Sequence, residues 1–376
     1  MTTTRPTRIL IVDDSAVMRN LLRAVIRSSS EFEVSGTAAD GESALGMVKN
    51  LSPDLILLDV EMPVMDGLET LRKLRAGGNR MPVIMCSSLT QRGARVTIEA
   101  LASGASDYVA KPAGQTSAAE AIKALAHELL PKISALTANL HAAPVSSLAP
   151  RTSLFADPLP GFRNQPITAT PSVLVIGVST GGPAALDILL PALPASFPLP
   201  VLIVQHMPEL FTRLLAERLS QRCPLQVSEA VEGEPVRPGH ILIARGNWHL
   251  EILGAARSSR AATLHLTQAA PENHCRPAVD VLFRTAAALY GPNVLAVVLT
   301  GMGSDGLAGS RLIREQGGTV LAQDQATSAI WGMPGAVARA GLAQRILSLQ
   351  DIAPEVARLA SRPRGGRVGM HEAVAL

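Results

Sequence analysis

Aromatic residues are scarce in this sequence: Phe, Trp and Tyr together make up 3% of its 376 residues. Proteins that bind single-stranded nucleic acids stack the bases on aromatic side chains, so this scarcity argues against that class of function. The core has to be aliphatic instead. A composition of 47% hydrophobic and 17% charged residues is sufficient to bury a large core, and it excludes wholesale disorder.

Cysteine is also scarce. Cys86, Cys223 and Cys275 are odd in number, far apart and without a C-x-x-C spacing. This usage indicates neither a disulfide framework nor a zinc knuckle, and it fits the reducing cytoplasm.

Long apolar runs are missing as well. The run at residues 9–12 stops at two aspartates, and the stretch 281–300 is interrupted by an arginine and a Gly-Pro pair. A signal peptide and a membrane span both need longer apolar segments. We therefore expect a cytoplasmic protein without membrane insertion.

The net charge of +3 and the pI of about 9.0 look basic. Residues 1–137, however, hold 15 basic and 15 acidic side chains, and residues 171–361 hold 14 of each. The excess comes from residues 138–170, with two arginines against one acid, and from residues 362–376, with three against one. The charge is therefore no argument for a nucleic-acid partner.

The length predicts two domains at the usual ~100–200 residues each. Continuous apolar runs at residues 8–12, 55–58 and 82–85 alternate with helical patterns, and a second such series starts at residue 173. Continuous apolar strands between helices predict doubly wound, mainly parallel α/β sheets. We predict a first domain at 1–137, a Pro-, Ala- and Ser-rich linker at 138–170, a second domain at 171–361 and a flexible tail at 362–376.

Charged groups follow several strands of the first domain. Asp13 and Asp14 follow the first strand, Asp59 follows residues 55–58, and Lys111 follows residues 107–110. Carboxyl ends of parallel strands meet at one sheet edge, where crowded carboxylates favour Mg²⁺ and a lysine can hold a phosphoryl oxygen. With the hydroxyl of Ser87, this pattern favours phosphoryl transfer onto Asp59.

Residues 8 to about 125 resemble a response-regulator receiver domain. The resemblance implies a flavodoxin-like fold, Asp59 as phosphoacceptor, and a histidine kinase as phosphoryl donor. It also assigns roles to further residues: Asp13, Asp14 and Asp59 as the Mg²⁺ site, and Ser87, Tyr108 and Lys111 as the switch residues.

The second domain opens with a Gly-x-Ser-x-Gly turn. Its first strand runs into Gly177-Val-Ser179-Thr-Gly181, where glycines expose a serine hydroxyl between a strand and a helix. Such turns also bind phosphates or simply reverse the chain, so the motif alone leaves the alternatives open.

A base and an orienting carboxylate are available at neighbouring strand ends. His206 follows the apolar run 201–204, and Asp305 lies in the glycine-rich loop after residues 294–299. A serine hydroxyl becomes nucleophilic when an imidazole accepts its proton and a carboxylate orients that imidazole. The sequence thus predicts a catalytic triad of Ser179, His206 and Asp305. Other histidines are available, and His206 is preferred by its position.

The order Ser, His, Asp and the surrounding segments resemble the chemotaxis protein-glutamate methylesterases (CheB). The matching segments are 177–182, 205–207, 300–306, 274–283, 322–326 and 332–334. The resemblance implies a receiver joined to an esterase that demethylates glutamyl γ-methyl esters and deamidates glutamines on chemotaxis receptors. It further implies backbone oxyanion donors at Thr180 and Met302, with no cofactor for the esterase. One departure is Arg245, where the family tends to have proline.

Two alternatives stay open from the sequence. The same esterase chemistry could act on another protein of a chemosensory-like pathway, or the chain could be a phosphorylation-dependent adaptor with a vestigial triad. Release of receptor methyl groups by the purified protein separates these alternatives. A further hypothesis is that the unphosphorylated first domain blocks access to Ser179.

Overall fold

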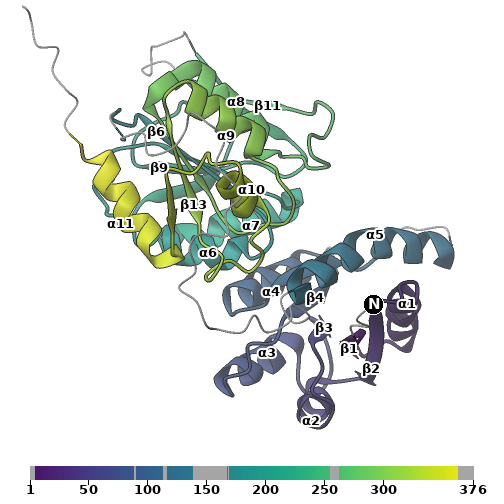
Figure 1. The fold of residues 1–376 in the computed structure, drawn as a ribbon. Coiled ribbons are helices and arrows are strands. Elements are labelled where there is room, and N and C mark those ends of the chain that lie inside the picture. Colours follow the sequence, from purple (N-terminus) through teal and green to yellow (C-terminus); the bar gives the residue numbers. More distant parts are fainter. Residues whose placement is uncertain are drawn as a thin grey trace, which may run out of the picture.

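The computed structural model describes residues 5–88, 90–112, 117–138, 167, 169–254 and 262–362. It consists of two α/β units, each built on its own sheet with helices on both faces (Figure 1). The predicted fold class of two doubly wound α/β domains is confirmed.

The first unit has a five-stranded parallel sheet in the order β2-β1-β3-β4-β5. The chain turns back between β1 and β3, so the carboxyl ends of these two strands form the topological switch point at which ligands bind. The strands are β1 (Thr7–Val12), β2 (Phe32–Ala38), β3 (Leu55–Asp59), β4 (Val83–Ser87) and β5 (Asp107–Ala110). The helices are α1 (Ala16–Arg27), α2 (Gly41–Leu51), α3 (Gly67–Ala76), α4 (Gln91–Ala102) and α5 (Ala118–Thr137).

The second unit has a seven-stranded parallel sheet in the order β14-β13-β12-β6-β7-β9-β8 and a separate β10-β11 hairpin. Its switch point lies between β6 and β12. The strands are β6 (Val173–Val178), β7 (Val201–Gln205), β8 (Gln226–Glu229), β9 (His240–Ile243), β10 (His249–Leu253), β11 (Thr263–Thr267), β12 (Val294–Val298), β13 (Thr319–Gln323) and β14 (Arg345–Leu347). The helices are α6 (Gly182–Leu189), α7 (Glu209–Ser220), α8 (Val279–Tyr290), η3 (Gly291–Asn293), α9 (Leu307–Glu315), α10 (Met333–Arg339) and α11 (Leu349–Ala360).

Local sequence signals explain how several helices begin. Ser15 accepts a hydrogen bond from the Met18 amide at the start of α1. Asp66 caps α3 by accepting a hydrogen bond from the Glu69 amide at 2.8 Å. Each such side chain satisfies an amide that has no partner within its helix.

The two units share a buried apolar cluster that includes Leu101 and Tyr108 of the first and Phe211 of the second. Helix α4 of the first unit packs against α6 and α7 of the second (Figure 1). The Tyr108 and Phe211 rings stack with centroids 4.5 Å apart. One buried hydrogen bond crosses the interface, from Thr180 Oγ1 to Asp107 Oδ2 at 2.6 Å.

Helix α5 stops at Thr137 and β6 starts at Val173, and the domain limits at 137 and 171 stay a prediction. The predicted linker and tail lie almost wholly outside the described residues, so their assignment stays a prediction. Within the described ranges, no helix combines the length and apolarity that crossing a membrane requires.

Candidate functional site

The acidic residues of the first unit meet at its switch point. Asp13 follows β1, Asp59 ends β3, and both carboxylates are almost completely buried. Lys111 Nζ lies 2.8 Å from Asp13 Oδ2 and 2.8 Å from Asp59 Oδ1. Asp14 is exposed, yet one of its carboxylate oxygens lies within 4.8 Å of a carboxylate oxygen of Asp13 and of Asp59. The structure thus brings together the four residues expected there.

Electrostatics at this site favour a cation. Burial and the neighbouring Asp13 raise the pKa of Asp59 to about 6, although Lys111 opposes the shift. Three carboxylates within reach of one ion form an all-oxygen donor set, which suits a hard divalent cation. Asp13, Asp14 and Asp59 therefore fit Mg²⁺.

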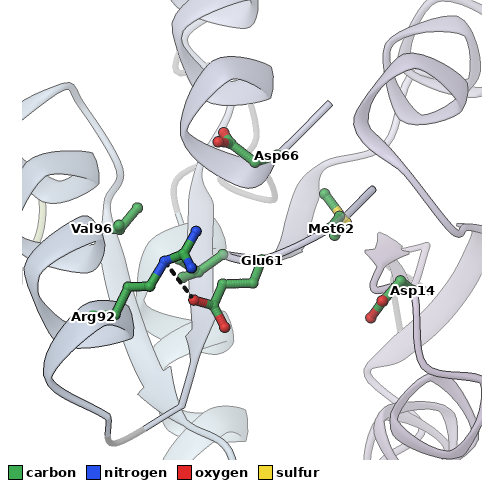
Figure 2. A pocket seen from close by; sticks show the side chains of 7 residues that line it. Asp14, Glu61, Met62, Asp66, Arg92 and Val96 are labelled. Atoms are coloured by element: carbon green, nitrogen blue, oxygen red, sulfur yellow. Dashed lines mark ion pairs between the residues drawn. The ribbon is translucent and has the colours of Figure 1, made fainter. Parts of the chain in front are cut away.

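A surface pocket of about 390 Å³ adjoins the acidic residues. Asp14, Met62 and Asp66 line it, and an Arg92–Glu61 ion pair of 3.4 Å stands at one side (Figure 2). The pocket is open to solvent beside Asp14, one of the three carboxylates of the acidic site.

Ser87 and Tyr108 contact partners other than Asp59. Ser87 Oγ accepts a hydrogen bond from Thr97 Oγ1 at 2.7 Å and donates one to the Ser88 carbonyl at 3.1 Å. Tyr108 is buried against Phe211, and Lys132 Nζ lies 5.1 Å from its ring centroid. Both side chains would have to reorient to respond to a phosphoryl group at Asp59.

Three strand ends of the second unit carry Ser179, His206 and Asp305. Ser179 follows β6, His206 follows β7 on one side, and Asp305 lies beyond β12 on the other. Because β6 lies between β7 and β12, these residues converge at the switch point. Gly301 allows this convergence, since a Cβ there would lie 2.7 Å from Ser179 Cβ.

His206 is held between Asp305 and Cys275. Its Nε2 lies 2.8 Å from Asp305 Oδ2, and its Nδ1 lies 3.5 Å from Cys275 Sγ. Burial disfavours the charged imidazole, but these two contacts outweigh it and raise the pKa of His206 to about 9. Ser179 lines the same cleft; among the described residues, no hydrogen bond joins its hydroxyl to His206.

Asp305 is fixed by a set of hydrogen bonds. Its Oδ2 also accepts from the Val279 amide, and its Oδ1 accepts from the amides of Asp280 and Gly306 and from Asn273 Nδ2. Burial opposes the charge of Asp305, but the bonds from His206 and the backbone outweigh it and hold the pKa of this carboxyl below its usual value. The carboxylate is thereby oriented toward the imidazole.

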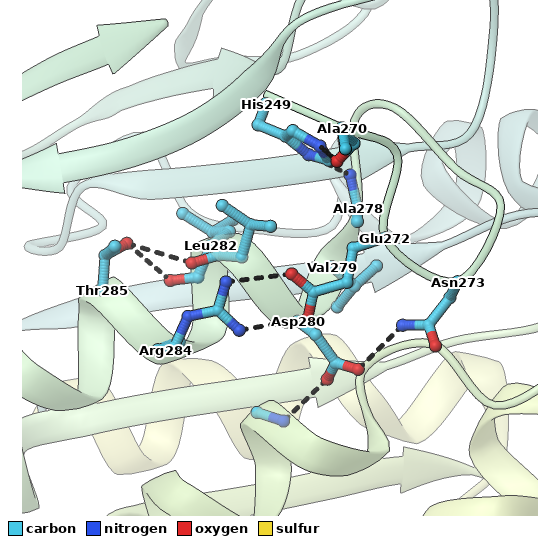
Figure 3. Close-up of polar contacts among 12 residues, drawn as sticks. His249, Ala270, Glu272, Asn273, Ala278, Val279, Asp280, Leu282, Arg284 and Thr285 are labelled. Carbon is cyan, nitrogen blue, oxygen red and sulfur yellow. Dashed lines mark hydrogen bonds and ion pairs between the residues drawn. The ribbon is translucent and has the colours of Figure 1, made fainter. Parts of the chain in front are cut away.

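A second buried carboxylate, Asp280, stands behind Asp305. Asn273 Nδ2 lies 2.9 Å from Asp280 Oδ2 and 2.9 Å from Asp305 Oδ1, so one amide group bridges both acids. Figure 3 shows Asn273, on the loop before α8, facing Asp280 in the first turn of α8. Burial and the Asp305 charge raise the pKa of Asp280.

Hydrogen bonds also fix the loop that carries Asn273 and Cys275. Buried His249 contacts both ends, with its Nε2 3.1 Å from the Ala270 carbonyl and its Nδ1 accepting from the Ala278 amide (Figure 3). Arg284 adds a two-pronged ion pair with Glu272. The loop is consequently a rigid wall of the cleft.

Two backbone amides face this cleft without an acceptor. Among the described residues, neither the Thr180 nor the Met302 amide donates a hydrogen bond. The Ser179 carbonyl, in contrast, accepts from the Gly182 amide and from Gln205 Nε2. Free amides beside a serine are suited to stabilise an oxyanion.

The cleft measures about 1100 Å³ and lies between the two units. Ser179, His206 and Cys275 line it from the second unit, and Tyr108 and Lys132 line it from the first. The first unit therefore forms one wall of the candidate active site.

Comparison with known proteins identifies both units. A family model described as CheB methylesterase matches residues 174–356, and one described as Response regulator receiver domain matches residues 9–123. A Nocardioides protein named protein-glutamate methylesterase/protein-glutamine glutaminase is 50% identical, covering 95% of this chain and 96% of its own. The chain belongs to the CheB family.

Two further similarities complete the comparison. A Trichodesmium erythraeum protein of the same name is 48% identical over 93% of this chain and 98% of its own. The crystal structure of the Thermotoga maritima CheB methylesterase catalytic domain is 41% identical, with a TM-score of 0.48 over 51% of this chain and all of that one.

Sequence reasoning missed Asn273, Cys275 and Asp280 as neighbours of the expected triad. Cys275 and Asp280 lie in the segment 274–283 that resembles the CheB family, but nothing in the segment itself assigns them a contact. Arg245, the departure from the family pattern, forms an ion pair with Glu209 and lies over the Trp248 ring. It therefore holds the start of α7 rather than entering the triad.

Proposed function

We propose that this chain hydrolyses glutamyl γ-methyl esters and deamidates glutamines on the cytoplasmic domains of chemotaxis receptors, under the control of phosphorylation. The observation that carries the proposal is the His206–Asp305 hydrogen bond in the Ser179 cleft of a CheB-family chain. The protein would act in the cytoplasm, where receptor tails and a histidine kinase are both accessible.

Ester hydrolysis follows from the order of the contacts. Asp305 occupies the Nε2 side of His206, so Nδ1 is the nitrogen that accepts the proton of Ser179 as its oxygen attacks the γ-carbonyl. The amides of Thr180 and Met302 stabilise the oxyanion, a contribution worth ~2.7–4 kcal/mol per donor. The protonated imidazole then delivers its proton to the departing methanol or, from glutamine, ammonia.

Water completes the cycle. His206 takes a proton from the water, and the resulting hydroxide attacks the acyl carbon. The bond from that carbon to Ser179 Oγ then breaks, the imidazolium returns its proton to Oγ, and glutamate is released. Against the effect of burial, Asp305 and Cys275 raise the pKa of His206 to about 9, so the imidazole acts as a base more readily as the pH rises toward that value.

The receiver supplies the control. Asp59 accepts the phosphoryl group, Lys111 compensates its charge, and Ser87 and Tyr108 respond to it. Mg²⁺ held by Asp13, Asp14 and Asp59 would neutralise the phosphoryl oxygens.

We expect phosphorylation of Asp59 to move the receiver away from the cleft at Ser179. Tyr108 stacks on Phe211, and its neighbour Asp107 holds Thr180, the residue after the nucleophile. Reorientation of Tyr108 would strain both contacts at once, so the receiver would detach from the second domain.

Replacement of Ser179 tests the activity. We expect Ser179→Ala to abolish methanol release from methylated receptor by a factor on the order of 10⁶ in kcat, as for other serine hydrolases. The same variant should accept phosphate at Asp59 at the wild-type rate. Retained esterase activity would exclude Ser179 as the nucleophile, and wild-type protein without any methanol release would contradict the proposed function.

A further inference from the structure

The cluster of His206, Cys275 and Asp305 holds three metal-ligating side chains whose donor atoms lie within 4.8 Å of one another. The imidazole is central: Nε2 faces Asp305 at 2.8 Å and Nδ1 faces Cys275 Sγ at 3.5 Å. The ester hydrolysis described above gives Cys275 no role.

The separation of Nδ1 from Cys275 Sγ fits two ligands of one zinc ion. Zinc binds histidine nitrogen at about 2.0–2.1 Å and thiolate sulfur at about 2.3 Å, usually with tetrahedral angles. Two such ligands stand about 3.5 Å apart. Cys275 Sγ lies 3.5 Å from His206 Nδ1, so the two donor atoms are already at the separation that one tetrahedral ion requires.

Asp305 supplies the outer contact that metal-binding histidines require. A histidine ligand almost always donates its second ring N–H to a carboxylate, which fixes the ring and makes the free nitrogen more basic. Asp305 is the carboxylate that accepts from Nε2 of His206. Four further donors hold it in place: the amides of Val279, Asp280 and Gly306, and Asn273 Nδ2.

Cys275 is equally well fixed. It pairs with Glu272 through two backbone hydrogen bonds of 2.9 and 3.1 Å, which close a tight turn through Asn273 and His274. Both turn residues have left-handed backbone angles, with φ of 54° and 62°. The thiol is partly exposed and lines the 1100 Å³ cleft, so water can fill the remaining coordination positions.

From this geometry we infer that His206 and Cys275 form a binding site for Zn²⁺, and that bound Zn²⁺ inhibits the esterase. Cys275 binds as the thiolate and releases its proton to solvent. The ion occupies Nδ1, the nitrogen that has to accept the Ser179 proton; this inhibitory part rests on the proposed function. A nitrogen–sulfur donor pair selects Zn²⁺ over Mg²⁺, whereas the all-oxygen receiver site has the opposite preference.

Cobalt substitution tests the binding separately from the activity. Co²⁺ reports thiolate ligation by a sulfur-to-metal charge-transfer absorption, and excess Mg²⁺ keeps the receiver site occupied by an ion that gives no such band. The protein is the full chain without an affinity tag, in wild-type form and as Cys275→Ser and Cys223→Ser. Cys223 does not line the cleft, so Cys223→Ser is the matched control. Circular dichroism and phosphate acceptance at Asp59 show that each variant is folded.

We expect the band in wild type and Cys223→Ser, its loss in Cys275→Ser, and competition by Zn²⁺. In the esterase assay, the Zn²⁺ concentration that halves the rate should rise at least about 10-fold in Cys275→Ser, because even outer contacts are worth ~10–100-fold in metal affinity. Absence of the band from wild type, or its persistence in folded Cys275→Ser, would overturn the site. A normal band with equal Zn²⁺ sensitivity of all three proteins would overturn the inhibition. A normal band in a protein without esterase activity would leave the metal site standing and contradict the proposed function.

Discussion

The two candidate sites occupy the same position in two similar sheets but prepare their nucleophiles in opposite ways. In the receiver, buried Asp59 is already an anion that Lys111 and Asp13 hold in balance. In the second domain, the proposed nucleophile Ser179 is neutral and would depend on the imidazole of His206 and on a carboxylate, Asp305, which five hydrogen bonds hold in place. The switch point of a doubly wound sheet thus supplies convergence, and the residues at the strand ends decide the chemistry.

The sites also differ in access. The pocket beside Asp14 opens to solvent, whereas Tyr108 and Lys132 of the receiver wall the cleft at Ser179. In the proposed function, the open site would accept phosphate at any time, whereas the covered site would react with a receptor only after the covering unit has moved.

Removing the orienting carboxylate is the sharpest test of the hydrogen-bonded site. We expect Asp305→Asn to lower kcat by about 10⁴, as the equivalent change does in a serine protease, because the imidazole loses its tautomer and orientation. Since Asp305 helps to raise the pKa of His206 to about 9, the residual rate should reach its plateau at lower pH than in wild type. A pH–rate series in the presence of a chelator measures both effects. An unchanged kcat would remove Asp305 from the triad.

Replacing Lys111 tests whether its positive charge stabilises the acidic site of the receiver. Lys111→Met leaves Asp13 and Asp59 facing each other without their partner, and breaking such a buried pair costs about 3–5 kcal/mol. Urea unfolding of the receiver should show this loss, and Mg²⁺ should recover part of it by binding the freed carboxylates. The esterase domain should unfold as in wild type. If the free energy of unfolding of the receiver does not fall, Lys111 does not compensate the charges of Asp13 and Asp59.

Asn273 tests whether the orientation of Asp305 depends on more than the backbone. Asn273→Ala removes one hydrogen bond from each of two carboxylates, and bonds to charged groups are worth ~1.5–3 kcal/mol. We expect kcat to fall by about 10- to 100-fold with little change in KM. Asn293→Ala, which removes an amide bond to the Thr170 carbonyl far from the cleft, is the control. Equal kinetics of the two variants would make Asn273 a structural residue only.

The difference in access is tested at Asp107. Asp107→Ala removes the acceptor of the Thr180 hydroxyl, so we expect the unphosphorylated protein to gain about tenfold in esterase rate. The phosphorylated rate should stay the same. Asp40→Ala removes an exposed helix cap of the receiver and controls for lower receiver stability. A basal rate as low as that of the Asp40 variant would show that the Thr180 contact does not restrain the enzyme.

Much of this organisation can be predicted from local patterns. Continuous apolar runs place the strands, and Asp13, Asp59, Ser179, His206 and Asp305 follow directly from their position after such runs. The β10-β11 hairpin and the edge strands β8 and β14 could not be predicted in the same way, because they are short and only partly buried.

Contacts between distant segments could not be predicted from the sequence, for a different reason. Cys275 meets His206 across 69 positions, and Thr180 meets Asp107 across 73. Such pairs form when helices and strands that are distant in the sequence pack together, and the hydrophobic periodicity of a short segment does not specify that packing. Asp280 looks like an ordinary first-turn acid of a helix, and only burial beside Asp305 reveals it as part of a network.

The covalent continuity of the chain between α5 and β6 has a consequence for the signal itself. The covering unit and the covered unit are parts of one molecule, so separation is a unimolecular event whose equilibrium does not depend on how many copies the cell holds. Dilution cannot switch the enzyme on, and overproduction cannot switch it off. In the proposed mechanism, a single phosphoryl group would therefore have to outweigh only the contacts within one molecule, which include the apolar packing of α4 and the Thr180–Asp107 hydrogen bond.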